Sequence, residues 1–235
     1  MRLSPVRAMI VAMGSRLFVV AVGAVVALGA ITLTRAAAAP VVVPPEPADK
    51  IAPAAGQDSA EIVLAGGCFW CTELGMEAVV GVTDVVSGYA GGEAMAAKYD
   101  LVAAGRTDHA EVIRVTYDPS QITLGEVFRA FFLIHDPTQL NRQGPDVGKQ
   151  YRSAIFYADD AQKQAAEAYL TQLRESGMYG DPVVTTLEPL TQFHEAEAYH
   201  QDFVAKNPTN GYVVRYALPK VEKLKKHLPE LAASE

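Results

Sequence analysis

The segment 61–73, EIVLAGGCFWCTE, is the most specific local pattern in the chain and holds both cysteines and the single tryptophan of the 235 residues. Its apolar run predicts a strand over 62–65, and the two glycines that follow predict a tight turn. A helix is expected over 68–79. A cysteine at a helix N-terminus in Cys-x-x-Cys spacing can ionise at a lowered pKa. The segment therefore predicts a strand–turn–helix unit that presents a reactive thiol.

Strand and helix patterns alternate through the rest of the chain. Residues 124–134 combine an apolar helical stripe with a capping box formed by Thr123 and Glu126. The polar loop 136–150 is rich in turn residues and is expected to adopt a defined conformation rather than a flexible one. Further strands are expected over 82–88, 111–117, 153–157 and 183–187, and further helices over 161–175, 193–204 and 219–227. The pattern predicts an α+β fold of α/β-like appearance, in which helices flank a mixed central sheet in a single catalytic domain.

The N-terminal region has the layout of an export signal. Three arginines precede an uncharged apolar run over 17–33, and four alanines follow at 36–39. We expect 1–38 to be a signal peptide or membrane anchor, so that the protein is exported, either periplasmic or anchored facing the periplasm. Residues 39–59 are expected to be a Pro/Ala-rich linker, 60–222 the main domain, and 223–235 the end of a basic helix and a tail.

The charge balance disfavours some partners. The formal net charge is −7, and the arginines of 1–38 have no acid beside them, so the remaining chain is more acidic still. An acidic domain is a poor partner for nucleic acid or anionic membranes. We therefore expect no nucleic-acid partner.

The cysteine pair has several chemical interpretations. Cys68 is the candidate nucleophile, although a free cysteine can also be a small buried hydrophobe. Cys71 lies on the same helical face within disulfide reach, so the pair is either redox-active or, in an exported protein, a structural staple. Zinc would need two more ligands, and the five histidines have no suitable spacing; we expect no metal. A general thiol–disulfide oxidoreductase is the alternative function, which the bulky Phe69 and Trp70 between the sulfurs disfavour.

Glu111 is the most informative acid. On its strand it alternates in phase with Ile113, Val115 and Tyr117, so its carboxyl should be partly desolvated and its pKa raised. Such a group can serve as a general acid near neutral pH. The competing interpretation is a rim residue paired with a base, and the pattern leaves both open. Taken singly, Tyr99, Asp146 and Tyr151 look like packing or turn residues.

Seven segments together resemble one enzyme family. They occur in order at 67–71, 88–92, 109–119, 135–139, 142–148, 150–155 and 196–201, and the longest reads His-Ala-Glu-Val-Ile-Arg-Val-Thr-Tyr-Asp-Pro. The chain from about 61 to 216 resembles peptide methionine sulfoxide reductases of the A type. This class reduces methionine sulfoxide back to methionine.

The resemblance implies a role for each matching residue. Cys68 attacks the sulfoxide sulfur, Phe69 and Trp70 cradle the methyl group, and Glu111 donates a proton to the sulfoxide oxygen. Tyr99 and Tyr151 add hydrogen bonds, and Asp146 orders the substrate and tunes the site. The implied substrates are methionine S-sulfoxide in oxidised proteins and as the free amino acid. No cofactor is bound, a thioredoxin-like donor supplies electrons, and a monomer is expected.

The chain departs from many relatives in its cysteines. Those relatives have a glycine after the Phe-Trp pair and resolving cysteines near the C-terminus, whereas this chain has no cysteine after Cys71. The resemblance therefore implies that a sulfenic acid on Cys68 is resolved by Cys71, as in a Cys-Phe-Trp-Cys subgroup. Asp108 stands before His109 where glycine is common, and we have no account of that change.

Overall fold

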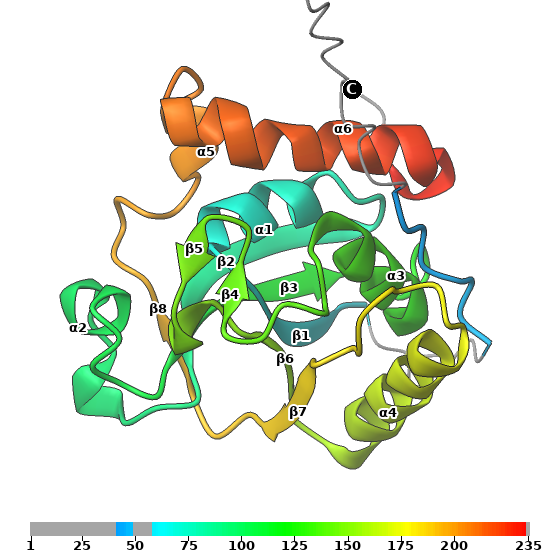
Figure 1. Cartoon of the computed structure of the whole chain (residues 1–235), viewed down its shortest axis with the longest axis horizontal. Coiled ribbons are helices and arrows are strands. Elements are labelled where there is room, and N and C mark those ends of the chain that lie inside the picture. The colour runs from blue at the N-terminus through cyan, green and yellow to red at the C-terminus, as the bar shows by residue number, and fades with distance from the viewer. Residues whose placement is uncertain (1–40, 49–57, 234–235) are drawn as a thin grey trace, which may run out of the picture. The chain divides into compact units, whose positions relative to one another are not determined.

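A six-stranded mixed sheet is the centre of the fold in the computed structural model, which describes residues 41–48 and 58–233. Its order is β7 (Thr186–Pro189), β6 (Ser153–Tyr157), β1 (Ala60–Gly66), β3 (Ala110–Tyr117), β2 (Val82–Ala90) and β8 (Phe193–Glu195). Neighbouring strands are antiparallel except for β6 and β7, which are parallel. The predicted α+β architecture with a mixed sheet is confirmed (Figure 1).

Six α-helices accompany this sheet in the described part of the chain. They are α1 (Phe69–Glu77), α2 (Tyr99–Ala103), α3 (Leu124–Ile134), α4 (Asp160–Glu175), α5 (Phe203–Lys206) and α6 (Leu218–His227). Single turns η1 (Ala94–Ala96), η2 (Lys149–Tyr151) and η4 (Pro229–Leu231), the π-helical turn η3 (Val213–Ala217) and the hairpin β4 (Arg142–Gln143)–β5 (Asp146–Val147) complete the set. None of the helices described is long and apolar enough to span a bilayer. The signal or anchor predicted for 1–38 lies outside the described residues and stays a prediction.

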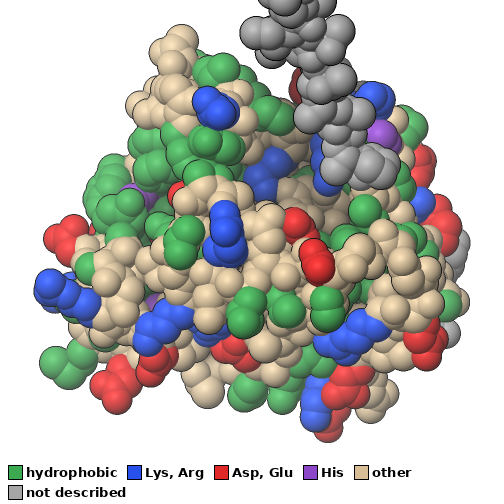
Figure 2. Space-filling model, viewed as in Figure 1, with side chains coloured by type: hydrophobic (Ala, Val, Ile, Leu, Met, Phe, Trp, Pro, Cys, Tyr) green, Lys and Arg blue, Asp and Glu red, His purple; other side chains and the backbone are tan. Residues whose placement is uncertain are grey.

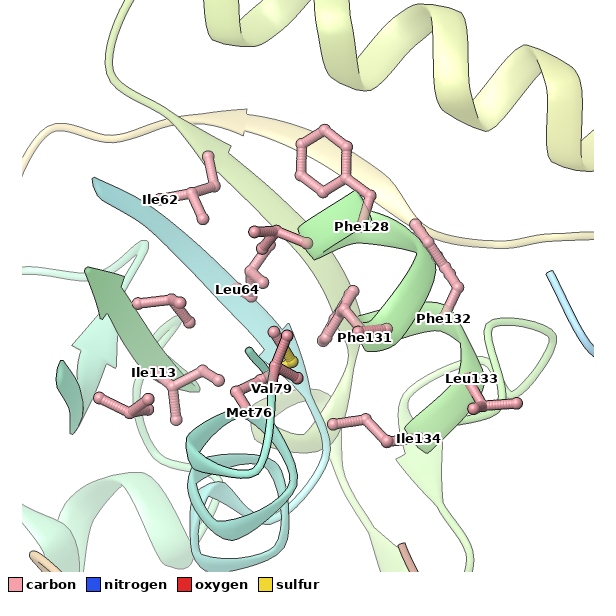
Figure 3. Packing of buried hydrophobic residues seen from close by; sticks show 14 of the residues in the cluster. Ile62, Leu64, Met76, Val79, Ile113, Phe128, Phe131, Phe132, Leu133 and Ile134 are labelled. Atoms are coloured by element: carbon pink, nitrogen blue, oxygen red, sulfur yellow. The ribbon is translucent and has the colours of Figure 1, made fainter. Parts of the chain in front are cut away.

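The main core lies between the sheet and helices α1 and α3. Figure 3 shows Leu64 of β1 and Ile113 of β3 facing Met76 of α1 and Phe131 of α3, and all four side chains are fully buried. Burying each such side chain contributes roughly 1.5–3 kcal/mol. The helix predicted over 124–134 is confirmed with its capping box, because Thr123 and Glu126 exchange the expected hydrogen bonds. Helix α6 packs against both α1 and α3.

The C-terminal end of α3 is closed entirely by side chains. The last four carbonyls of a helix have no partner within the helix and need one elsewhere when they are buried. Here His135 donates to Phe131 O, Tyr179 to Phe132 O, Lys223 to Leu133 O and Lys220 to Ile134 O. Two of these four donors are lysines of α6, so the packing of α6 and the closure of α3 depend on each other.

The prediction of a helix over 193–204 is wrong. Residues 193–195 form β8 on the free edge of β2, turns follow, and only α5 is helical. The reason is tertiary: Gly88 on β2 leaves room for β8, because a Cβ there would lie 2.4 Å from the Phe193 ring. Pairing with this edge outweighs the local helical pattern. The strand expected over 183–187 is displaced to β7, where it pairs with β6.

Residues 41–48, which fall in the expected linker, pack on α3 and α4. Arg129 of α3 donates to Pro44 O at 3.1 Å, Tyr169 of α4 donates to Pro45 O at 2.9 Å, and Gln172 donates to Glu46 O. Prolines have few conformations to lose, and the carbonyls of such a segment remain free to accept hydrogen bonds. The described part of this segment is therefore held on the domain by its backbone.

Candidate active site

The turn between β1 and α1 places Cys68 at the start of a helix, as the sequence predicts. Gly67 has φ +94°, and a Cβ there would lie 2.5 Å from the Gln143 side chain of β4. Only glycine fits such a position without strain. Cys68 is the N-cap residue of α1, and its carbonyl accepts hydrogen bonds from Cys71 N at 3.1 Å and Thr72 N at 3.3 Å. The positive end of the helix dipole therefore lies beside this thiol.

The two cysteines are free thiols that line one cavity. Cys68 is 9% exposed and Cys71 4%. The cavity has a volume of about 220 Å³ and also includes Asp146, Tyr212 and Lys220. The Cys68 thiol interacts with Cys71 and lowers the pKa of Cys71, while that contact, burial and Glu111 raise the pKa of Cys68. Of the two thiols, Cys71 is therefore the one that gives up its proton first.

Glu111 is buried beside Cys68 rather than paired at a rim. It lies on β3 opposite Tyr89 of β2, is 2% exposed, and accepts a hydrogen bond from Phe69 N at 3.1 Å. Burial raises the pKa of Glu111 to about 8, against the opposing effect of the Phe69 hydrogen bond. The predicted desolvated carboxyl is confirmed, and it is protonated at neutral pH.

Two phenols lie near Glu111, and each belongs to a different element. Tyr99 begins α2 and Tyr151 ends η2. Burial, followed by the charge of Glu111, raises the pKa of Tyr99 to about 12 and that of Tyr151 further. Both hydroxyls therefore keep their protons and are available as hydrogen-bond donors.

Trp70 is oriented by residues from the C-terminal third of the chain. Its indole Nε1 donates to His200 Nδ1 at 3.0 Å, and its ring stacks on Phe203 with centroids 3.8 Å apart at 9°. The Phe69 ring lies 4.9 Å from the His200 ring. His200 belongs to one of the family-like segments, but no pattern in the sequence pointed to its contact with Trp70.

Asp146 and Tyr212 form the far side of the site. Asp146 on β5 accepts a hydrogen bond from Tyr212 OH at 2.5 Å, and the Cys71 sulfur lies 3.8 Å from the same hydroxyl. The β4–β5 hairpin is held in place because Gln143 exchanges two hydrogen bonds with the backbone of Asp136. The loop 136–150, which the sequence predicts to have a defined conformation, is therefore held in one by these hydrogen bonds. Tyr212 was missed, because a tyrosine in a region without periodicity carries no local signal.

The structure thus brings all eight predicted site residues into one neighbourhood. It unites a thiol at a helix N-terminus, a second thiol, a neutral carboxyl, two phenols and an aromatic wall. No cluster of three or more His, Cys, Asp or Glu side chains suited to a metal ion occurs in 41–48 or 58–233. In this arrangement a thiol can attack an electrophilic centre while the carboxyl protonates the atom that this centre gives up. The two thiols can then form an internal disulfide.

Comparisons with known proteins agree on one family. The sequence model of peptide methionine sulfoxide reductase matches residues 60–231. A peptide methionine sulfoxide reductase MsrA from Natronomonas pharaonis is 47% identical over 172 residues, covering 73% of this chain and 97% of its own. One from Haloquadratum walsbyi is 50% identical over 167 residues, covering 71% and 95%. Among solved structures, reduced Mxr1 from Saccharomyces cerevisiae has a TM-score of 0.60 at 40% identity, covering 69% of this chain and 91% of that one.

Proposed function

Since the chain belongs to the A-type peptide methionine sulfoxide reductase family and reduces methionine S-sulfoxide in the repair of oxidised proteins, we propose that Cys68 is its nucleophile and Cys71 its resolving thiol. The observation that carries this proposal is the single neighbourhood of three groups. Cys68 caps α1, Glu111 holds a proton beside it, and Cys71 lines the same cavity.

The first step transfers oxygen from the substrate to the enzyme. The proton of Cys68 passes to Cys71, and the Cys68 thiolate attacks the sulfoxide sulfur. Glu111 protonates the sulfoxide oxygen while Tyr99 and Tyr151 donate hydrogen bonds to it, which offsets the charge that develops there. Methionine leaves with its sulfur reduced, and the oxygen remains on Cys68 as a sulfenic acid.

The aromatic wall selects the methyl group of the substrate. Phe69 is fully buried and Trp70 is half-buried. His200 and Phe203 hold the Trp70 ring, so a methyl group can lie against fixed apolar faces. Asp146, fixed by Tyr212, orders the polar part of the substrate.

The second step returns the enzyme to a disulfide. Cys71 attacks the Cys68 sulfenic sulfur, a sulfur–sulfur bond forms, and the oxygen leaves as water. A thioredoxin-like dithiol then exchanges with this disulfide and restores both thiols, so no bound cofactor is needed. The same site accepts protein-bound and free methionine sulfoxide, since the groups named contact only the side chain and its near surroundings.

The full-length protein tests this function when it is offered each sulfoxide epimer with dithiothreitol and methionine release is followed. We expect reduction of the S epimer alone, and none after Cys68→Ser. Failure to reduce either epimer would contradict the proposal.

Cys71→Ser tests the resolving role separately. We expect one equivalent of methionine per protein, a trapped Cys68 sulfenic acid, and loss of multiple turnover with thioredoxin. Full turnover of this variant with thioredoxin would remove Cys71 from the resolving role while leaving Cys68 in place.

A further inference from the structure

The cavity beside the two thiols has two lysines in its wall. Helix α6 contributes Lys220 and Lys223 to the lining, next to Cys68, Cys71 and Tyr212. Figure 2 shows a hollow in this face of the molecule with Lys or Arg side chains at its base. The sulfoxide chemistry proposed above uses Glu111, Tyr99 and Tyr151 as donors and gives neither lysine a part.

Lys220 is held at this place by the end of α3. Its Nζ donates to Ile134 O, the last residue of α3, and Lys223 donates to Leu133 O at 2.6 Å. The C-terminal end of a helix carries partial negative charge and favours an ammonium group. An ammonium has three N–H donors, so one capping bond leaves Lys220 with further capacity toward the cavity.

The titratable groups that face Cys71 come from five elements. Cys68 caps the same helix, Glu111 lies on β3, Asp146 on β5, and Tyr212 precedes η3. These groups are neutral or negative. Lys220 on α6 is the positive group that acts on Cys71, where it lowers the pKa, while Cys71 in turn opposes the lowering of the Lys220 pKa by burial. Lys220 adds to the lowering of the Lys223 pKa by burial, and Lys223 is not among the main groups that shift the pKa of either thiol.

We propose that Lys220 is a positioning residue for the resolving step, in which its ammonium group holds Cys71 as the thiolate that attacks the Cys68 sulfenic acid. The inference rests on the proposed role of Cys71 and extends it. Methionine release leaves Cys71 with the proton it accepted from Cys68, so a thiolate must form again before a disulfide can. A fixed positive charge in the shared cavity favours that ionisation at neutral pH.

The step balances without any added reactant. The Cys71 thiolate forms a bond to the Cys68 sulfur, the Cys68 sulfur–oxygen bond breaks, and hydroxide leaves and takes a proton from solvent to become water. Cys71 is oxidised and the sulfenic sulfur is reduced to the disulfide level. Lys220 exchanges no proton in this step and acts only through its charge.

A single-turnover experiment isolates this step. The reduced full-length protein receives one equivalent of methionine S-sulfoxide, samples are alkylated at intervals, and intact mass separates the sulfenic acid from the disulfide between pH 6 and pH 10. In Lys220→Met we expect disulfide formation to slow about tenfold at pH 7 and its pH midpoint to rise by about one unit. Methionine release in the same samples should change far less.

Three variants control for the capping role of the lysine. Lys220→Gln removes the charge but keeps a donor for Ile134 O, so it should show the same shift even if Lys220→Met folds poorly. Lys220→Arg keeps the charge and should restore the wild-type midpoint. Lys223→Met removes the neighbouring cap and should leave the midpoint unchanged.

Two results would overturn the inference: an unshifted midpoint in Lys220→Gln, or an equal shift in Lys223→Met. Cys71→Ser distinguishes this failure from failure of the proposed function. If Cys71→Ser stalls after one turnover while Lys220→Gln resolves normally, only the role of Lys220 falls. If Cys71→Ser cycles normally, the resolving role itself is wrong.

Discussion

Glu73 and Glu111 are two buried carboxyls with different surroundings. Each is 2% exposed. Burial raises the pKa of both, to about 7 for Glu73 and about 8 for Glu111. Glu111 accepts a hydrogen bond from Phe69 N, directly after the reactive cysteine. Glu73 lies farther along α1 near Glu77 and Asp202, and none of the described residues donates a hydrogen bond to its Oε1.

The comparison separates the retention of a proton from its use. Desolvation alone keeps a carboxyl protonated near neutral pH, and both residues meet that condition. A general acid must also reach the reacting atom, and only Glu111 neighbours Cys68 and the phenols of Tyr99 and Tyr151. A raised pKa therefore identifies candidates, and geometry chooses between them.

The largest expected difference is in the chemical step. We expect Glu111→Gln to slow single-turnover methionine release about 100-fold or more at pH 7, because general acid catalysis contributes at least that factor. The wild-type rate should fall above about pH 8, where Glu111 loses its proton, and the variant should lack that fall. Rapid quench with methionine detection measures both.

Glu73→Gln is the matched control for that experiment, because it makes the same substitution at an equally buried carboxyl. Its rate should stay within about twofold of wild type. A comparable loss in both variants would show that burial of a carboxyl, rather than its place beside Cys68, matters for the chemistry.

The second difference is in how the stability of the folded protein depends on pH. The pKa of each carboxyl is raised above its unfolded value near 4.3, so the folded protein binds more protons than the unfolded chain between that value and the folded pKa. The stability from this proton uptake is fully present below about pH 4 and is lost as pH rises through about 7 for Glu73 and 8 for Glu111.

Each glutamine variant should therefore flatten the fall of the unfolding free energy between pH 5 and pH 8, by an amount on the order of a few kcal/mol. Urea titrations at pH 5, 6.5 and 8 measure this slope. We expect the larger flattening in Glu111→Gln, whose pKa is the higher. Wild-type and variant curves that run parallel would contradict the raised pKa values.

The smallest expected effect is that of a single phenol. Tyr151→Phe removes one donor near Glu111 and should slow single-turnover methionine release by about three- to tenfold, since the loss of one neutral hydrogen bond costs about 1 kcal/mol. Tyr99→Phe should behave alike, and the double variant should lose more than either. Tyr117→Phe, a buried phenol at the other end of β3, is a control that should leave the rate unchanged.

Much of the site could be predicted because its signals are local. The Gly-Gly turn, the Cys-x-x-Cys spacing and the position of Glu111 in an alternating strand each lie within one short segment. The sequence left the role of Glu111 open between a general acid and a rim residue, because alternation shows which face a side chain shares and not what covers that face. The hydrogen bond from Phe69 N and the burial in the structure decide it.

The predictions that failed or were missed depend on distant pairing. Residues 193–204 have a helical pattern, yet the open edge of β2 at Gly88 recruits 193–195 as a strand. Tyr212 and Lys220 follow all the recognised segments, and nothing nearby in the chain shows that they reach Asp146 and the end of α3.

The sequence by itself determined the strand–turn–helix that presents Cys68, the confinement of both thiols to one helical turn, and the family-like segments, because these depend on spacing and backbone preference over a few residues. Only the tertiary structure decided which buried carboxyl adjoins the thiols, what fixes Trp70, and that a lysine of α6 shares their cavity. Charge, burial and contact are set by residues far apart in the chain, and they exist only once the sheet and helices have packed together.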